Sequence, residues 1–304
     1  TTAAIGGIMY PEMVKRGYPS DYSTAVQAVG GTLGIIIPPS IVFVIYGSTN
    51  GVSISKLLMS GMLPGILTAV VLCLYGYVVA KKENFPKSFD QFSLKRVLKS
   101  LKGAVWALMM PLIILGGIYG GIFTPTESAM IACAYGLVVS FFVTKELTVK
   151  NFFDVVSKTA ASTANVTVMF LAAQVFGFLI AYYDITTTIA NFFVAVSPNW
   201  IIFMGLVFIL LTITGMFMEV GATNVILSPL LAPVAAAFGI DPIHFGMVFV
   251  FLLALGQATP PFGSTMFIAC GISGERVAAV IRRLLPFVLV EYACALVFAY
   301  VPWF

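Results

Sequence analysis

The sequence has 304 residues, of which 60% are hydrophobic and 9% are charged, and its mean hydropathy is +1.04. Soluble domains carry about 25% charged residues, so this composition excludes an ordinary soluble domain and indicates a membrane protein. The formal net charge is only +4, and nothing in it indicates nucleic-acid binding. The chain opens on "TTAAIGG" without a signal-peptide pattern, and we expect it to be part of a longer membrane protein.

Apolar runs of about 20 residues predict membrane-spanning helices. In chain order they lie near 23–49, 56–80, 104–123, 127–144, 160–183, 200–218, 243–272 and 277–303. The segment 225–240 is also apolar, but it contains two prolines and is expected to be too short to cross. It predicts the return arm of a re-entrant hairpin whose tip is "GATN", Gly221 to Asn224.

The basic residues predict the topology. If every span crosses once and the hairpin returns to its own side, the connectors at 15–16, 81–102, 145–158 and 276–283 share one side of the membrane. Those connectors carry fifteen of the sixteen basic residues, and only Lys56 falls on the other side. Basic loops are enriched on the cytoplasmic side, so we expect these connectors to be cytoplasmic.

Two proline pairs interrupt apolar runs, Pro38–Pro39 in "IIIPPS" and Pro260–Pro261 in "GQATPPFGST". Proline removes a backbone donor and breaks a helix, so each pair predicts a broken helix. The pairs are 222 residues apart, and the same offset aligns Pro11 with Pro233 and Pro64 with Pro286. Residues 1–80 and about 205–304 are therefore expected to be two copies of one unit, inverted by the predicted topology. Inverted repeats with broken helices are typical of secondary transporters.

Three stretches carry a family resemblance: "GGTLGIIIPPSI" (30–41), "GGIYGGIFTPTESA" (116–129), and "GIDPIHFGMVFV" with "GQATPPFG" (within 239–263). The sequence resembles the large membrane (M) subunit of tripartite ATP-independent periplasmic (TRAP) transporters over essentially its whole length. The resemblance implies a bacterial inner-membrane protein, not an enzyme, that imports an organic acid such as sialic acid or a C4-dicarboxylate. It also implies an elevator mechanism with Na⁺ as coupling ion, no other cofactor and no transition metal.

The implied partners are a periplasmic substrate-binding protein (P subunit) and a small membrane (Q) subunit. Family members carry several helices and a hairpin tip ahead of "TTAAIG", and that first arm is expected to be missing here.

The resemblance implies two Na⁺ sites and a substrate site. The second Na⁺ site would use the hairpin tip and the second break, Gly221, Thr223, Asn224, Gly256, Gln257, Thr259 and Pro260. The first would use Gly31, Thr32, Gly34, Pro38 and Ser40. Hydroxyls and amides at helix starts would hold a substrate carboxylate, at Thr1, Ser40, Asn224, Ser264 and Thr265. For any one serine or threonine, a hydrogen bond to its own helix is an equal alternative.

Four further ionisable residues need an interpretation. Glu219 precedes the tip and would lie near Na⁺, face a partner, or bond the backbone of the tip. Glu291 lies within the last span and is expected to be structural, either protonated and packed or capping a neighbouring helix. Glu127 in "TPTES" is expected to start a helix, and His244 is expected to be a solvated interfacial residue.

Together these patterns predict an all-α polytopic membrane protein with inverted repeats, re-entrant helical hairpins and the architecture of elevator-type ion transporters. We expect a moving transport part at 1–54 and about 205–274. The scaffold would be 55–204, with a cytoplasmic amphipathic segment at 81–103, and 275–304. The alternatives are a single-component Na⁺/dicarboxylate symporter without a binding protein, a channel, and an intramembrane enzyme that uses Glu219 or His244.

Overall fold

The computed structural model describes residues 1–86 and 94–301, and within these ranges the chain is helical without β-strands. Among the described residues, six stretches are long and apolar enough to cross a membrane. The expectation of an all-α, multi-pass membrane protein is confirmed. Residues 87–93 of the expected amphipathic segment and residues 302–304 of the last expected span lie outside the described residues.

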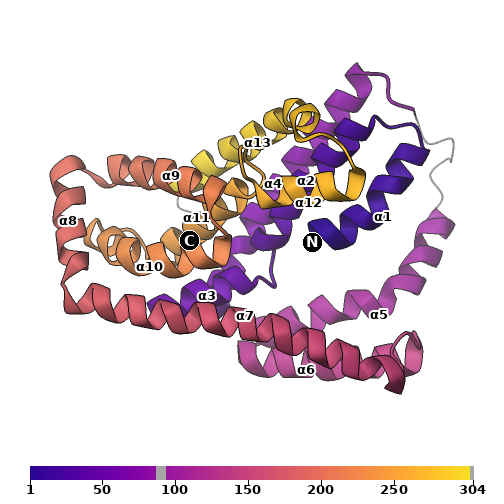
Figure 1. Cartoon of the computed structure of the whole chain (residues 1–304), viewed down its shortest axis with the longest axis horizontal. Helices are drawn as coiled ribbons and strands as arrows, with labels where there is room; N and C mark the ends of the chain where they lie inside the picture. Colours follow the sequence, from indigo (N-terminus) through magenta and orange to yellow (C-terminus); the bar gives the residue numbers. More distant parts are fainter. Residues whose placement is uncertain (87–93, 302–304) are drawn as a thin grey trace. The chain divides into compact units, whose positions relative to one another are not determined.

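The helices follow one another along the chain as drawn in Figure 1. Their bounds are α1 Thr2–Lys15, α2 Ser20–Ile36, α3 Ile41–Asn50, α4 Ile54–Lys82, α5 Leu94–Tyr119, α6 Pro125–Val138, a π-helical turn η1 Val139–Val143, α7 Val149–Tyr182, α8 Ile185–Val196, α9 Trp200–Phe217, α10 Val220–Ala237, α11 Pro242–Gly256, α12 Ser264–Ser273 and α13 Val277–Tyr300.

The chain divides into two compact units. The first contains Thr1–Lys87 and Val175–Phe304, and the second contains Ser88–Gln174. The first unit includes both proline breaks and helices that the sequence assigned to both the transport part and the scaffold. The functional division into those two parts stays a prediction.

The internal repeat is visible in the helices of the first unit. Helices α1 to α4 recur as α10 to α13, and the offset of 222 brings the end of α1 onto the end of α10 and the start of α2 onto the start of α11. The starts of α3 and α4 differ from this offset by one residue. Each proline pair lies between two half-helices, α2 and α3 in one copy and α11 and α12 in the other, and each pair holds a cis peptide bond.

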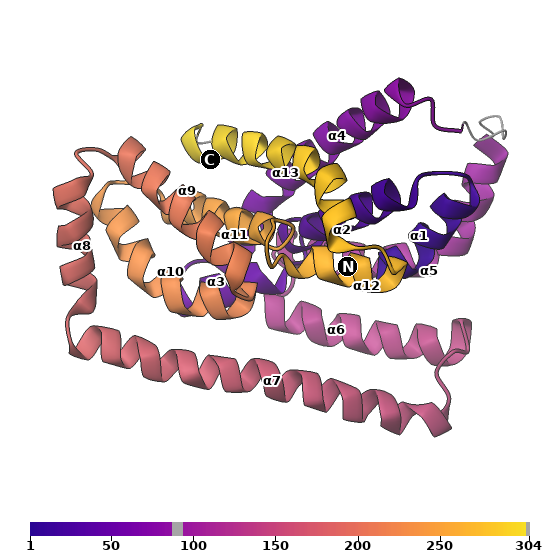
Figure 2. The ribbon, with the colours of Figure 1, turned by 45° about the horizontal axis from the view of Figure 1, so that its top comes forward.

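The two copies interlock. Helix α1 packs against α2 of its own copy and α12 of the other, and α10 packs against α11 of its own copy and α3 of the other. Figures 1 and 2 both show the N-terminal end of the chain beside α12. Each hairpin arm therefore contacts the second half-helix of the opposite copy, which places residues from both copies at both breaks.

Helix α11 forms the centre of this unit. From His244 to Gly256 every residue is buried, and α2, α3, α4, α9, α10 and α13 all pack around it. The sequence of α11 is apolar on all sides, as expected for a helix without a solvent or lipid face. The second break thus begins at the end of the most enclosed helix.

The connectors predicted to be cytoplasmic meet at one end of the unit. Arg283 at the start of α13 forms ion pairs with Asp21 at the start of α2 (Nε to Oδ2, 3.1 Å) and with Glu83 after α4. Tyr18 and Tyr22 pack edge-to-face on Phe85, with ring centroids 5.5 and 4.8 Å apart. This clustering agrees with the predicted topology of the first unit.

Two expectations about the hairpin and one about the only histidine are wrong. Gly221 to Asn224 form the first turn of α10, so the chain reverses earlier, at Met218 and Glu219. Helix α10 is 18 residues long and meets the length and hydropathy required of a span, although its segment was expected to be too short. His244 is buried, with Nε2 3.2 Å from the carbonyl oxygen of Ala299, because α13 covers it.

In the second unit α6 packs on α5, and Tyr135 donates a hydrogen bond to the carbonyl of Trp106. Residues 94–101 of the expected amphipathic segment are helical and continuous with the rest of α5. At the start of α6, Thr124 and Glu127 form a reciprocal capping box, which confirms Glu127 as a helix-start residue.

Candidate functional site

The second break is organised by Gln257, which is buried. Its Nε2 donates to the carbonyl oxygens of Gly215 (3.1 Å) and Met218 (3.0 Å), at the end of α9. Its Oε1 accepts a hydrogen bond of 2.5 Å from Ser264, the first residue of α12. Its backbone carbonyl accepts from both the amide (3.0 Å) and the hydroxyl (2.8 Å) of Thr265. One residue therefore connects the hairpin reversal to both half-helices of the break.

Gly256 and Gly215 bring α11 and α9 into backbone contact beside Gln257. A Cβ built on Gly256 would lie 2.5 Å from the Cα and 2.6 Å from the carbonyl carbon of Gly215. Only glycine fits at such an approach. On the far side of the reversal, Glu219 accepts a hydrogen bond from the amide of Ala222 (3.0 Å) and caps α10. Of the three roles considered for Glu219, bonding the tip backbone is the one confirmed.

The first break contains two buried oxygens without a hydrogen-bond partner among the described residues. Ser40, the residue before α3, is 4% exposed, and its hydroxyl is unpartnered. Asn224 is fully buried, and its Nδ2 donates to the carbonyl of Val42 in the first turn of α3 (2.9 Å), whereas its Oδ1 is unpartnered. The contact brings Asn224 of the second copy to the first turn of α3 in the first copy, the helix that Ser40 precedes.

The start of α1 occupies the corresponding position in the other copy. A Cβ on Gly31 would clash with Thr2 Oγ1 and lie 3.4 Å from Thr265 Cγ2, so Thr2 sits between α2 and the start of α12. A Cβ on Gly34 would clash with the side chain of Thr1 in the same way. Thr2 is buried, and the sequence reasoning missed it. The offset of 222 places Thr2 on Asn224 and would have identified it.

Three hydroxyls from the predicted Na⁺ sites are engaged elsewhere. Thr32 lies 2.7 Å from the carbonyl of Val29 in its own helix and 2.5 Å from Oε1 of Glu291 on α13. Thr223 donates to the carbonyl of Glu219 (2.9 Å). Thr259 donates to the carbonyl of Leu255 (2.8 Å) and lies 3.1 Å from the hydroxyl of Tyr292.

These contacts divide the predicted residues into three groups. One group surrounds Gln257 at the second break, with Gly256, Ser264 and Thr265. Another joins Ser40 and Asn224 at the start of α3, and the third joins Thr1, Gly31 and Gly34 at the start of α1. Pro38 is buried within the first break and Pro260 partly buried within the second. The remaining predicted residues, Thr32, Thr223, Thr259 and Gly221, do not share these contacts.

The site carries no lysine or arginine among the described residues that form these groups. Its positive character comes from the starts of α3 and α12, whose first-turn amides have no partners within their helices, whereas the start of α10 is capped by Glu219. Its buried oxygens, Ser40 Oγ and Asn224 Oδ1, suit a hard monovalent cation. The arrangement thus offers acceptors for a cation next to donors for an anion.

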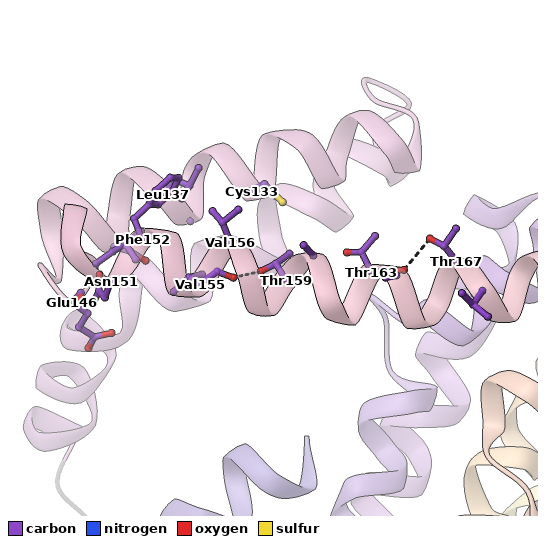
Figure 3. Close-up of a pocket in the computed structure, with 16 residues that line it drawn as sticks. Cys133, Leu137, Glu146, Asn151, Phe152, Val155, Val156, Thr159, Thr163 and Thr167 are labelled. Atoms are coloured by element: carbon purple, nitrogen blue, oxygen red, sulfur yellow. Dashed lines mark hydrogen bonds between the residues drawn. The ribbon is translucent and has the colours of Figure 1, made fainter.

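A separate groove lies in the second unit. Figure 3 shows it between α6, with Cys133 and Leu137, and α7, with Thr159, Thr163 and Thr167. Its volume is about 1120 Å³. The hydroxyls of Thr159 and Thr167 bond back to their own helix, and none of the predicted ion or substrate residues lines the groove.

Comparison with known proteins identifies the family of the chain. The family model of the tripartite ATP-independent periplasmic transporter, DctM component, matches residues 1–304. The chain is 40% identical over 302 residues to the isethionate TRAP transporter permease protein DctMQ of Oleidesulfovibrio alaskensis. The matched region is 99% of this chain and 48% of DctMQ.

Two other relatives carry different names. The chain is 35% identical to the C4-dicarboxylate TRAP transporter large permease protein DctM of Pseudomonas aeruginosa, over 99% of this chain and 70% of the relative. It is 34% identical to the sialic acid TRAP transporter permease protein SiaT of Haemophilus influenzae, over 94% of this chain and 46% of that relative. The chain thus spans about half the length of DctMQ and SiaT. All three relatives are named as permeases, and none as an enzyme.

Proposed function

Because the chain belongs to the family of the tripartite ATP-independent periplasmic transporter, DctM component, we propose that it is the permease part of a Na⁺-coupled importer of an organic acid. The substrates in the names of its relatives, isethionate, C4-dicarboxylates and sialic acid, are all organic anions. A substrate of the same class suits a site that has helix starts and hydroxyls but no basic side chain.

The observation that carries Na⁺ coupling is the pair of unpartnered oxygens at the first break. Buried polar atoms in proteins are nearly always hydrogen-bonded, yet Ser40 Oγ and Asn224 Oδ1 have no partner in the described part of the chain. A bound Na⁺ would satisfy both, together with carbonyls freed by the break. Ser40 and Asn224 belong to different repeats, so one ion would fix the arm of one copy against the half-helix of the other.

The Na⁺ and the anion would support each other's binding. A cation at the start of α3 adds positive charge to amides that already favour an anion. A carboxylate or sulfonate held there would in turn lower the electrostatic cost of the buried cation. Such mutual dependence is what coupled transport requires, because neither ligand then binds well alone.

The remaining parts of the proposal follow from the family. The protein would lie in the bacterial inner membrane and move its substrate by an elevator-type displacement of the expected transport part, residues 1–54 and about 205–274. A periplasmic substrate-binding protein would deliver the organic acid, and a small membrane subunit would complete the permease. The DctMQ name of one relative is in keeping with a permease of two fused parts.

Uptake of labelled organic acids into proteoliposomes tests the proposal. The full permease complex would be assayed with and without an inward Na⁺ gradient and with and without the binding protein. We expect uptake to require both. Uptake that needs Na⁺ alone would instead establish a single-component symporter, and flux independent of any gradient would overturn coupled transport.

A further inference from the structure

A pocket lies at the predicted cytoplasmic end of the first unit, apart from both breaks. It has a volume of about 310 Å³ and is lined by residues of α2, α4 and α13 and by Glu83, which follows α4. This is the place where the ion pairs of Arg283 join the three helices. Any molecule that occupies the pocket would contact all three helices at once.

The charges around the pocket are not balanced. Arg283 pairs with both Asp21 and Glu83, so this triad carries a formal net charge of −1, and Lys82 and Arg282 bring the total to +1. Lys82 and Arg282 also line the pocket, are exposed, and form no ion pair with any described residue. Two cations from different helices therefore face one small hollow, and this arrangement favours an anion that bridges them.

The floor of the pocket is formed by packed aromatic rings. Tyr75 and Phe287 pack at right angles with ring centroids 4.8 Å apart, and Tyr22 packs on Phe287 at 5.9 Å. The Tyr22 hydroxyl donates to the backbone carbonyl of Gly76 (3.4 Å). A small inorganic anion would gain nothing from contact with these rings, whereas the glycerol and first methylenes of a lipid would pack on them.

The pocket also opens onto the apolar surface of α4. Val78 lines it and is 58% exposed, and Leu74, one turn earlier, is 60% exposed. In a multi-pass membrane protein such an exposed apolar strip lies against lipid. A headgroup in the pocket would leave its acyl chain along this strip.

We propose that this pocket binds the phosphate group of an anionic phospholipid, held by Lys82 and Arg282 above the aromatic floor. The site is independent of the proposed transport activity. Bound lipid would stabilise the junction of α2, α4 and α13 by mass action, since it binds only when the three helices are in place.

Native mass spectrometry and thermal unfolding of the purified full permease complex test the site. The probes are phosphatidylglycerol, phosphatidylcholine and inorganic phosphate. We expect phosphatidylglycerol to bind more tightly than phosphatidylcholine and to raise the unfolding temperature. Each of the variants Lys82→Gln and Arg282→Gln should weaken phosphatidylglycerol binding roughly fivefold, and the double variant roughly thirtyfold, on the basis of about 1 kcal/mol per basic residue near an anionic lipid.

Matched controls are available on the same helices. Lys81 and Arg276 are exposed basic residues that do not line the pocket, so Lys81→Gln and Arg276→Gln should leave binding unchanged. Equal losses in these controls, or equal binding of the two phospholipids by the wild type, would overturn the proposal. If inorganic phosphate stabilises the complex as much as phosphatidylglycerol does, the occupant is a free anion and the lipid proposal is wrong.

Discussion

The two proline breaks have the same backbone plan and different side chains. At the offset of 222, Gln257 corresponds to Ile35 and Thr259 to Ile37. The second break is held by hydrogen bonds that join Gln257 to α9 and α12, whereas Ser40 and Asn224 at the first break have oxygens without a partner among the described residues. The repeat therefore supplies the geometry twice, and the side chains bridge the second break with hydrogen bonds while leaving these two oxygens at the first break free for the proposed ion.

The two breaks differ in how the buried polar groups of a membrane protein obtain hydrogen-bond partners. Without water, each unsatisfied buried group costs free energy. The second break satisfies its groups within the protein and is expected to be rigid before any ion binds. The first break is expected to become ordered only with its ion.

The largest expected effect is on the backbone contact of the second break. In Gly256→Ala the new methyl group would overlap the Gly215 backbone, which cannot move as a side chain can. We expect a loss of about 3 kcal/mol in the free energy of unfolding. Thermal unfolding in detergent would measure it.

Gly30→Ala is the matched control in the first copy, since nothing lies within 4 Å of a Cβ there. It should leave stability unchanged or slightly higher, because alanine favours helix. Equal unfolding temperatures for the two variants would contradict the close approach of α9 and α11.

Gln257→Ala removes the donor to two carbonyls and the acceptor for Ser264. We expect a loss of about 2 kcal/mol, because these buried groups are left unpaired. Hydrogen exchange should speed up in the last turn of α9. Gln257→Glu should be as harmful, since a carboxylate cannot donate to the Gly215 and Met218 carbonyls; full stability in that variant would show that those two bonds are unimportant.

The contact between Thr32 and Glu291 ties the first copy to α13. Both residues are fully buried; Thr32 contacts Oε1 of Glu291, and Oε2 has no partner among the described residues. Thr32→Val should cost about 1.5 kcal/mol, because it leaves the carboxyl group without its partner. The double variant Thr32→Val with Glu291→Leu should recover most of that loss, since it removes both partners together. Additive losses in this double-mutant cycle would rule out the pairing.

Much of the fold was predictable, because a membrane span needs about 20 apolar residues and proline marks a break. The offset of 222 located the repeat, and "TPTES" located the capping box at Glu127. The start of α10 was missed, because glycine and asparagine in "GATN" suggested a turn. In an apolar setting a helix continues through such residues once Glu219 caps it.

The site was predictable only in part, for a different reason. Its partners are distant in sequence: Gln257 bonds to carbonyls of α9, and Asn224 to a carbonyl of α3. Backbone carbonyls leave no signature in the sequence. The burial of His244 also depends on α13, more than fifty residues later. Such contacts follow from packing of the two copies, which the pattern of prolines and apolar runs does not specify.

The smallest expected effect compares one serine at each break. Ser264→Ala removes a hydrogen bond to Gln257 and should cost about 1 kcal/mol. Ser40→Ala removes a buried hydroxyl that has no partner in the described part of the chain, so the unfolding temperature without Na⁺ should not fall. If that hydroxyl binds the coupling ion, Ser40→Ala should nevertheless raise the Na⁺ concentration needed for half-maximal uptake, and Ser264→Ala should raise it much less. If the Na⁺ dependence of uptake is unchanged in Ser40→Ala, the proposal that Na⁺ binds at the first break is wrong. The two breaks would then differ only in how much they contribute to stability.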